Sequence, residues 1–273
     1  MRTPDHNRRQ VVECLEAFAT WEPEAYEQYL TDEPCVRVGH GVHTGRDALR
    51  RLAVAGARLF PDGVEILVVS SVAQGDQVGV DLRVRGLTAG GAQYENLHGM
   101  VFELDGAGKI MRAFDHSDTA HAVDALGLPA PALPEADLAF DPVPRNVQTT
   151  IAFFSAFLTW DPAQYERYLT DDPIYQGGRT VLTGRDGFRS IAALGRHLYP
   201  NGLDWEFESI FGEGQRTFLR MIVRAVPTRG IPYENYYAMS FDFADDGRIS
   251  AQREYTDTAY ARERFDYPTT RLT

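Results

Sequence analysis

The chain has 273 residues, 44% of them hydrophobic and 24% charged, a composition typical of a globular protein with one or two domains. Its 39 acidic residues outnumber 27 basic ones, and the resulting net charge of −12 repels phosphate backbones, which disfavours a nucleic-acid partner. No apolar run is long enough to span a bilayer and the first ten residues form no apolar leader, so we expect a cytoplasmic protein with no membrane partner.

The chain contains an internal repeat, which appears when it is shifted by 139 residues against itself. Trp21 then falls on Trp160, and no gap is needed at any point. The other matched segments are 29–32 with 168–171, 44–47 with 183–186, 94–96 with 233–235, and 118–120 with 257–259. A copy of about 115 residues is the size of a domain rather than of a solenoid repeat. We therefore predict domain 1 over residues 1–125 and domain 2 over 145–273.

The segment between the copies, residues 126–144, contains five prolines. Proline fixes φ and removes a backbone donor, so we predict an extended linker there.

Each copy begins with residues that have helical periodicity. Apolar side chains recur at helical spacing over residues 7–20, and over 147–157 in the second copy, which predicts an amphipathic helix. A short helix should follow, because Asp161 and Pro162 form a good start signal and Glu22-Pro23 a weaker one. The segments 31–34 and 170–173 predict a turn into a first strand. The segments 44–47 and 183–186 resemble capping boxes that open a third helix, ending near Pro61 and Pro200.

The rest of each copy has the period of two that is typical of strands. Apolar residues alternate over residues 64–68, 78–84 and 100–104, and over 239–243 in the second copy. Hairpin turns are expected at 105–108 and 245–247, before a last strand over 110–117 or 249–256. The order helix, helix, strand, helix, then about four strands predicts an α+β fold with three helices packed on a curved antiparallel sheet.

These elements and motifs resemble the nuclear-transport-factor-2-like (cystatin-like) superfamily, and within it the SnoaL-like group of polyketide cyclases and PhzA/PhzB proteins. The residues that carry the resemblance in copy two are 184–188, 198–202, 233–237, 246–249 and 253–255; in copy one they are 45–49, 60–63, 94–98, 108–110 and 114–116. The resemblance implies two tandem cone-shaped domains, each with a largely apolar pocket and cofactor-free chemistry. It also implies an acid at Glu254 and Asp115. The histidine of the PhzA/PhzB group falls at Leu52 and Ile191, which argues against phenazine-type condensation.

The first candidate site residues are the carboxylates Asp115 and Glu254, which lie 139 positions apart. A carboxyl group that lines an apolar pocket has a raised pKa and can serve as a general acid or base. The alternative is an exposed strand residue paired with Arg112 or Arg253. Since neighbours on a strand point to opposite faces, His116 and Asp115 cannot both face the pocket.

A second set of candidates lies on the strand before. His98 and Asn96 share one face of this strand, so His98 could relay a proton and Asn96 could hold a substrate oxygen. Their counterparts in copy two are Tyr237 and Asn235. The alternative is that this face packs against the other domain.

Several residues have weaker indications. The repeated aromatic residues, among them Trp21 and Trp160, are either core residues or a platform for substrate. Cys14 and Cys35 indicate small buried residues rather than a disulfide framework. His40 and His43 have no acidic or cysteine partner nearby, so we expect no metal, and without nucleotide-binding motifs we expect no cofactor.

Two functions remain open from the sequence. One is a cofactor-independent cyclase, isomerase or dehydratase that acts on a small apolar or aromatic natural-product intermediate, as in antibiotic biosynthesis. The other is a non-catalytic protein that binds such a molecule, for sequestration or self-resistance. In either case we expect the partner to be a small-molecule metabolite. We also expect the two domains to pair with each other as an intramolecular pseudo-dimer, giving a monomer or weak dimer.

Overall fold

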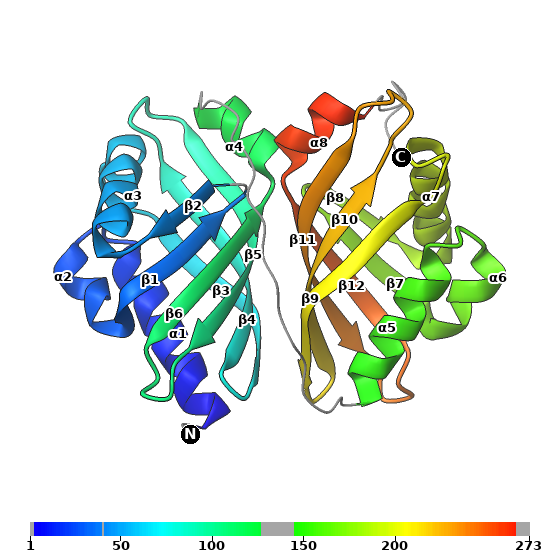
Figure 1. Cartoon of the computed structure of the whole chain (residues 1–273), viewed down its shortest axis with the longest axis horizontal. Coiled ribbons are helices and arrows are strands. Elements are labelled where there is room, and N and C mark those ends of the chain that lie inside the picture. The colour runs from blue at the N-terminus through cyan, green and yellow to red at the C-terminus, as the bar shows by residue number, and fades with distance from the viewer. Residues whose placement is uncertain (1–2, 40, 127–144, 266–273) are drawn as a thin grey trace. The chain divides into compact units, whose positions relative to one another are not determined.

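A computed structural model describes residues 3–39, 41–126 and 145–265. The chain divides into two compact units, Met1–Ala136 and Asp137–Thr273, called unit 1 and unit 2 below. Each unit has its own six-stranded sheet and its own helices (Figure 1). The predicted linker lies outside the described residues, except for Leu126, which ends a helix.

The two units have the same elements in the same order. Unit 1 consists of α1 (Pro4–Phe18), α2 (Pro23–Tyr26), the 3-10 helix η1 (Glu27–Tyr29), β1 (Leu30–Val38), β2 (Gly41–Thr44), α3 (Arg46–Leu59), β3 (Glu65–Gln74), β4 (Gln77–Leu87), β5 (Gln93–Leu104), β6 (Ile110–Ser117) and α4 (Thr119–Leu126). Unit 2 consists of α5 (Arg145–Phe157), α6 (Pro162–Tyr165), η2 (Glu166–Tyr168), β7 (Leu169–Gly177), β8 (Thr180–Thr183), α7 (Gly184–Leu198), β9 (Leu203–Glu213), β10 (Arg216–Ala225), β11 (Tyr233–Phe243), β12 (Ile249–Thr256) and α8 (Thr258–Arg264).

The sheets run in the order β2-β1-β6-β5-β4-β3 and β8-β7-β12-β11-β10-β9. This confirms the predicted α+β class and its strands. Two features differ from the expectation of a wholly antiparallel sheet and three helices. The pairs β1–β6 and β7–β12 are parallel, which is possible because a long stretch of chain connects the two strands of each pair. A further helix, α4 or α8, follows the last strand.

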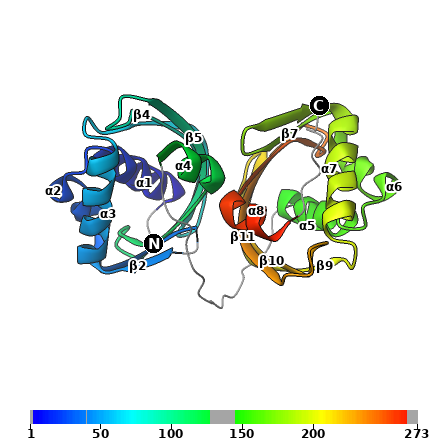
Figure 2. The same cartoon turned by 90° about the horizontal axis from the view of Figure 1, so that it is seen from above.

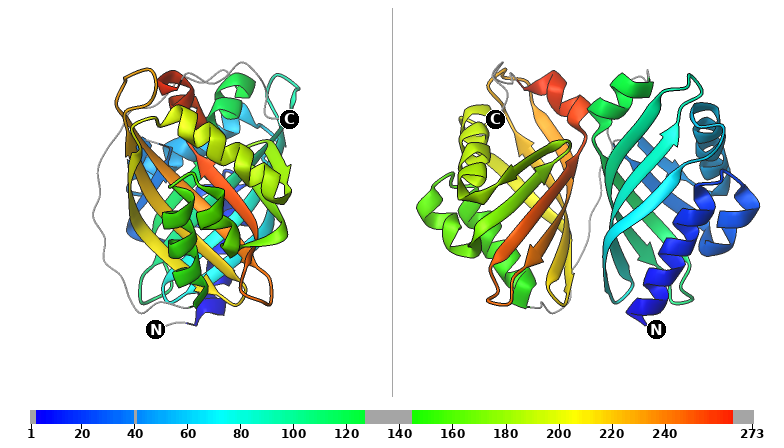
Figure 3. Two further views of the ribbon diagram at one scale, coloured as in Figure 1. Left: turned by 90° about the vertical axis from the view of Figure 1, so that its right-hand side faces the viewer. Right: turned by 180° about the vertical axis from the view of Figure 1, so that it is seen from behind.

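One face of each sheet is covered by the unit's helices, and it is called the interior face below. Helix α1 packs on β3 and β4, and α5 packs on β9 and β10. Figure 2, the view from above, shows each sheet curving toward its helices. The left view of Figure 3 shows the green helices of unit 2 lying over its strands. Three alternate residues of β4 point into this interior and join the core of unit 1: Val78, Val80 and Leu82. No helix among the described residues is long and apolar enough to cross a membrane.

The segments predicted as turns into the first strand lie inside β1 and β7. There the parallel ladder is interrupted: Leu169 pairs with Ile249, and the next paired residue is Ile174, with Ala251. Since Pro173 cannot donate to a ladder, the chain bulges away over these residues. The bulge leaves backbone carbonyls that need other partners.

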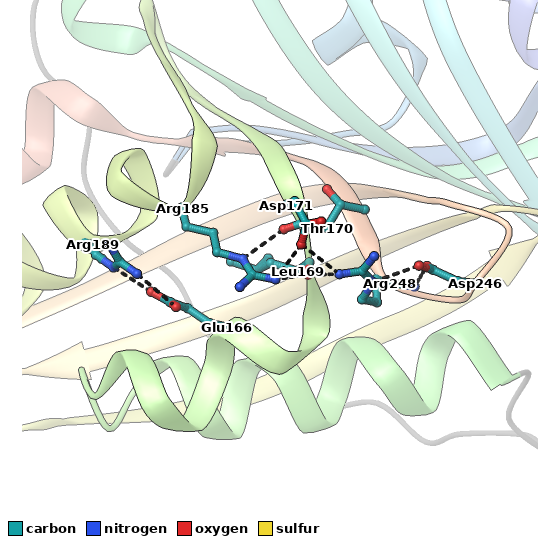
Figure 4. Close-up of polar contacts among 8 residues, drawn as sticks. All are labelled: Glu166, Leu169, Thr170, Asp171, Arg185, Arg189, Asp246 and Arg248. Atoms are coloured by element: carbon teal, nitrogen blue, oxygen red, sulfur yellow. Dashed lines mark hydrogen bonds and ion pairs between the residues drawn. The ribbon is translucent and has the colours of Figure 1, made fainter.

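Arginine side chains supply those partners (Figure 4). The guanidinium of Arg185, at the start of α7, donates to the carbonyls of Thr170 at 3.1 Å and Leu169 at 3.2 Å. Arg248 reaches the same Leu169 carbonyl from the other side, at 3.3 Å. In unit 1, Arg46 makes the equivalent bonds to Thr31 and Leu30. These bonds tie the third helix to the bulged strand.

The third helices exist as predicted, but the capping boxes do not form. Neither Thr44 nor Thr183 makes a side-chain cap hydrogen bond. Gly45 and Gly184 have φ values of 81° and 71°, a left-handed turn that sends the chain from the strand directly into the helix. In the repeated Thr-Gly-Arg-Asp motif, the glycine therefore makes the turn into the helix and the arginine bonds to the bulged strand, while the threonine forms no cap. By contrast, Asp161 caps α6 as predicted, accepting from the backbone N–H of Ala163.

Candidate functional site

His98 and Asp115 meet on the interior face of unit 1. Met100 of β5 pairs with Asp115 of β6, so His98, two residues before Met100, lies diagonally across from the carboxylate on the same face. The His98 Nδ1 atom lies 2.8 Å from Asp115 Oδ1. Their side chains keep 16% and 15% of their exposure, so both remain within reach of a small molecule.

Two opposing effects set the pKa of His98. Desolvation in the interior lowers it, but the charge of Asp115 and the hydrogen bond to its carboxylate raise it by more, so the net pKa lies above the usual 6.5. The carboxylate of Asp115 thus favours the protonated form of His98.

The alternative in which Asp115 and Glu254 are exposed strand residues paired with arginine is wrong. Arg112 pairs with Glu103 at 3.2 Å, and Arg253 pairs with Asp242 at 2.9 Å. His116 is buried on the opposite face of β6 from Asp115, as the alternation along the strand predicts.

In unit 2, Glu254 occupies the place of Asp115. It pairs with Met239 across β11 and β12, on the interior face. Desolvation raises its pKa from 4.5 to about 7, although a hydrogen bond from the Tyr175 hydroxyl acts in the opposite direction. Near neutral pH both the acid and the carboxylate are therefore populated.

Tyr237 occupies the place of His98 and makes a different contact. Its hydroxyl lies 2.7 Å from that of Tyr233 rather than on the carboxylate. Burial, together with the nearby groups of Tyr199, Tyr233 and Glu254, raises its pKa well above 10, so the hydroxyl stays protonated. The two units thus have different polar partners around the same carboxylate position.

Asn96 and Asn235 belong to a hydrogen-bond network that both units share. In unit 1 the Asn96 amide donates to the Tyr94 hydroxyl at 3.0 Å and to the Asp118 carbonyl at 3.1 Å. Asn235 makes the same two bonds, to Tyr233 and Asp257. Both amides are buried and tie the long central strand to the last helix. Because their donors are already used within the protein, a role in holding substrate stays a prediction.

Trp21 and Trp160 lie at the turn between the first two helices. Both have left-handed backbones, with φ values of 63° and 59°. The Trp21 indole N–H donates to the Phe60 carbonyl at 3.0 Å, and the Trp160 ring stacks on Tyr199 at 6.3 Å. Both side chains are partly exposed and pack against the cores, so contact with a substrate also stays a prediction.

The weaker candidates lie apart from the interior pair. Cys14 is buried and Cys35 partly exposed, both with free thiols. His40 lies outside the described residues, and elsewhere in the described chain no three histidine, cysteine or acidic side chains gather as a metal site. Leu52 and Ile191, at the position of the PhzA/PhzB histidine, pack on the two cores.

A surface groove of about 560 Å³ also lies in unit 1, near η1 and the start of β1. Its walls carry charged residues, among them Glu27, Arg46 and Lys109, and none of the predicted site residues. Arg46 and Lys109 are bonded there to backbone carbonyls of β1 and η1, which accounts for their presence.

Sequence reasoning missed Tyr175 and Gly177. A Cβ atom added to Gly177 would lie 2.5 Å from the Tyr175 hydroxyl, so the tyrosine ring folds over this glycine to reach Glu254. The available signal was a glycine inside a strand, two residues from a tyrosine on the same face. The capping aspartates Asp118 and Asp257, which begin α4 and α8, were missed as well.

Comparison with known proteins identifies the domain type. Residues 150–252 match the model of the SnoaL-like domain family. A search of curated proteins returned no match.

Three solved structures illustrate the similarity. A candidate SnoaL-like polyketide cyclase from Jannaschia sp. CCS1 is 17% identical over 48% of this chain and 99% of its own, with a TM-score of 0.42. An NTF2-like protein of unknown function from Burkholderia pseudomallei is 16% identical over 45% and 99%, with a TM-score of 0.41. TerC, co-crystallised with polyporic acid, is 16% identical over 44% and 96%, with a TM-score of 0.40.

The family match spans α7 and the strands β7 to β11 of unit 2, together with most of α5 and the start of β12. Unit 1 has the same elements and the same strand order. Unit 2 is therefore a SnoaL-like domain, and unit 1 is a second copy of the same fold.

Proposed function

We propose that the chain is a cofactor-independent enzyme that moves a proton on a small apolar or aromatic metabolite, within the cyclase, isomerase and dehydratase chemistry of natural-product pathways. The observation that carries this proposal is the His98–Asp115 pair, 2.8 Å apart and partly exposed on an otherwise apolar interior face. Unit 1 is thus the catalytic unit that the geometry favours.

The pair can perform general base catalysis. When the Nδ1–H group of His98 donates a hydrogen bond to the Asp115 carboxylate, the lone pair lies on Nε2, which can take a proton from a carbon or hydroxyl of the substrate. Asp115 then stabilises the imidazolium, in agreement with the raised pKa of His98. The imidazolium then returns the proton to a different atom of the substrate, which completes an isomerisation without any other reagent.

Glu254 is the corresponding acid–base group of unit 2. A pKa of about 7 suits proton transfer near neutral pH. Its partner is Tyr175 rather than a histidine, so any reaction there would use the carboxyl group alone.

The test uses 5-nitrobenzisoxazole, a small aromatic compound whose ring opens when a base removes its C3 proton. The C–H and N–O bonds break together and release a coloured 2-cyano-4-nitrophenolate, so no co-reactant is needed. We expect His98→Gln and Asp115→Asn each to lower the rate by at least about tenfold, since general base catalysis typically contributes 10²–10⁴-fold. We also expect Asp115→Asn to move the pH at which activity rises to lower values, because the carboxylate no longer raises the pKa of His98.

The control is Glu95→Gln, which removes an exposed carboxylate from the same strand as His98. It should leave both the rate and the pH profile unchanged. If the wild-type chain is no faster than buffer, or the His98 and Asp115 variants match wild type, the catalytic proposal fails. A ligand retained without turnover would then favour the binding protein. That alternative is motivated by the apolar Leu52 and Ile191 at the position of the PhzA/PhzB histidine, and by catalytic candidates that differ between the two copies.

A further inference from the structure

The two units differ in the size of the side chains on their interior faces. At equivalent positions, 139 residues apart, unit 2 has an aromatic residue where unit 1 has a smaller one. Three such pairs are Val36 and Tyr175, Leu49 and Phe188, and His98 and Tyr237. Tyr175 and Tyr237 lie near Glu254, and Phe188 packs against Tyr175. The hydrophobic residues of these pairs belong to the core clusters of their units. The same fold therefore encloses more side-chain volume in unit 2.

Identical residues at equivalent positions show the effect of these exchanges. Met100 and Phe18 are partly exposed in unit 1, whereas Met239 and Phe157 in unit 2 are buried, with 3% and 6% of their surface exposed. Since the residue types are the same in each pair, the difference comes from the neighbouring side chains. Met100 and Phe18 of unit 1 thus keep an exposure that their counterparts in unit 2 have lost.

The strand beside the carboxylate shows how unit 2 is filled. The ring of Tyr175 lies over Gly177, and Gly177 pairs with Glu254 across the parallel strands. In unit 1 the corresponding residues are Val36 and Val38, and Val38 pairs with Asp115. Tyr175 therefore occupies the space that lies in front of Asp115 in unit 1. Glu254 itself keeps partial exposure, so water can reach it.

From these observations we infer that the chain binds one organic ligand, in unit 1 beside His98 and Asp115, and that unit 2 fills its own interior with aromatic side chains and takes no ligand of comparable size. This inference rests on the proposed function only in assuming that the ligand is a small, largely apolar molecule. The smaller side chains and the residual exposure in unit 1 make room for an aromatic ring. The imidazole of His98 then recognises a hydroxyl or an acidic C–H group on it.

The test is a reciprocal exchange of the filling residues, with 1-naphthol as the probe. The double variant Val36→Tyr with Val38→Gly gives unit 1 the filling of unit 2, and the glycine is required because a Cβ atom there would meet the tyrosine hydroxyl. The matched control, Tyr175→Val with Gly177→Val, gives unit 2 the residues of unit 1. Titration calorimetry measures affinity and native mass spectrometry counts ligands per chain, with circular dichroism as a check of folding.

We expect one 1-naphthol molecule per wild-type chain. The unit 1 variant should bind it at least tenfold more weakly, and the unit 2 variant should keep the wild-type affinity of the site in unit 1. Two equivalent ligands per wild-type chain, no binding at all, or loss of binding only in the unit 2 variant would overturn the inference.

A measurement on the wild-type chain covers the case in which the unit 1 variant does not fold. The ligand should shift the imidazole NMR resonance of His98 and leave the carboxyl resonance of Glu254 in place; the opposite pattern contradicts the inference. If the ligand shifts the His98 resonance as expected but the His98 and Asp115 variants keep the wild-type rate of proton transfer, only the catalytic proposal is refuted.

Discussion

Glu254 shows how the interior changes the chemistry of one side chain. Its carboxyl group faces the aromatic core of unit 2, and desolvation raises its pKa from 4.5 to about 7. An unfolded chain releases this proton near pH 4.5, while the folded chain holds it until about pH 7. Folding therefore takes up a proton between these pH values, and the contribution of Glu254 to stability falls as the pH rises.

We predict that Glu254→Gln removes this pH dependence. A glutamine resembles the protonated acid, so relative to wild type the variant should gain stability between about pH 5 and about pH 8, by up to about 3 kcal/mol at 1.36 kcal/mol per pKa unit. Urea unfolding at both pH values measures the change. Glu206→Gln, at an exposed carboxylate of the same unit, should change stability equally at both. If the free energy of unfolding of Glu254→Gln differs from that of wild type by the same amount at both pH values, the Glu254 carboxyl titrates alike in the folded and unfolded chain.

At the scale of elements, a tryptophan and a helix glycine join the first turn of each unit to its third helix. The Trp160 ring lies against Gly195 of α7, where an added Cβ atom would come within 2.4 Å of the ring. Trp21 lies against Gly56 of α3 in the same way, with a distance of 2.6 Å. The glycines therefore permit close packing in the middle of helices that they otherwise weaken.

We predict that Gly195→Ala destabilises the protein, by about 1–3 kcal/mol, because the methyl group overpacks the site. Helix propensity alone predicts the opposite sign, a gain of up to about 1 kcal/mol, so the direction of the shift in unfolding midpoint decides between the two. The control is the same change in a Trp160→Leu background, where the ring is absent and the destabilisation should largely disappear. A gain of stability in the wild-type background would mean that the ring moves aside without cost.

At the scale of the whole molecule, the duplication places two domains with separate cores in one chain. The duplication already supplies two copies of the domain within one chain, so no second chain is needed to bring two copies together. We therefore predict a monomer, which light scattering across a range of protein concentrations should report as the mass of a single chain, 30.6 kDa. An obligate higher oligomer would contradict this prediction.

The sequence by itself determined the duplication, the order of helices and strands, and the carboxylate at positions 115 and 254. These features are local or periodic: a strand places alternate residues on one face and a helix repeats every 3.6 residues, so the pattern of apolar residues defines the elements and most of their faces. It also placed His98 and Asp115 as separate candidates, without showing that they touch.

Only the tertiary structure decided which groups meet. His98 reaches Asp115 because the antiparallel register sets Met100 opposite that carboxylate, and Tyr175 reaches Glu254 because β7 and β12 run parallel. The predicted capping boxes do not form for a similar reason: a glycine turn begins the helix there, and an arginine side chain bonds to the carbonyls of the bulged strand. Register and long-range pairing depend on contacts between residues far apart in the chain, and no local pattern encodes them.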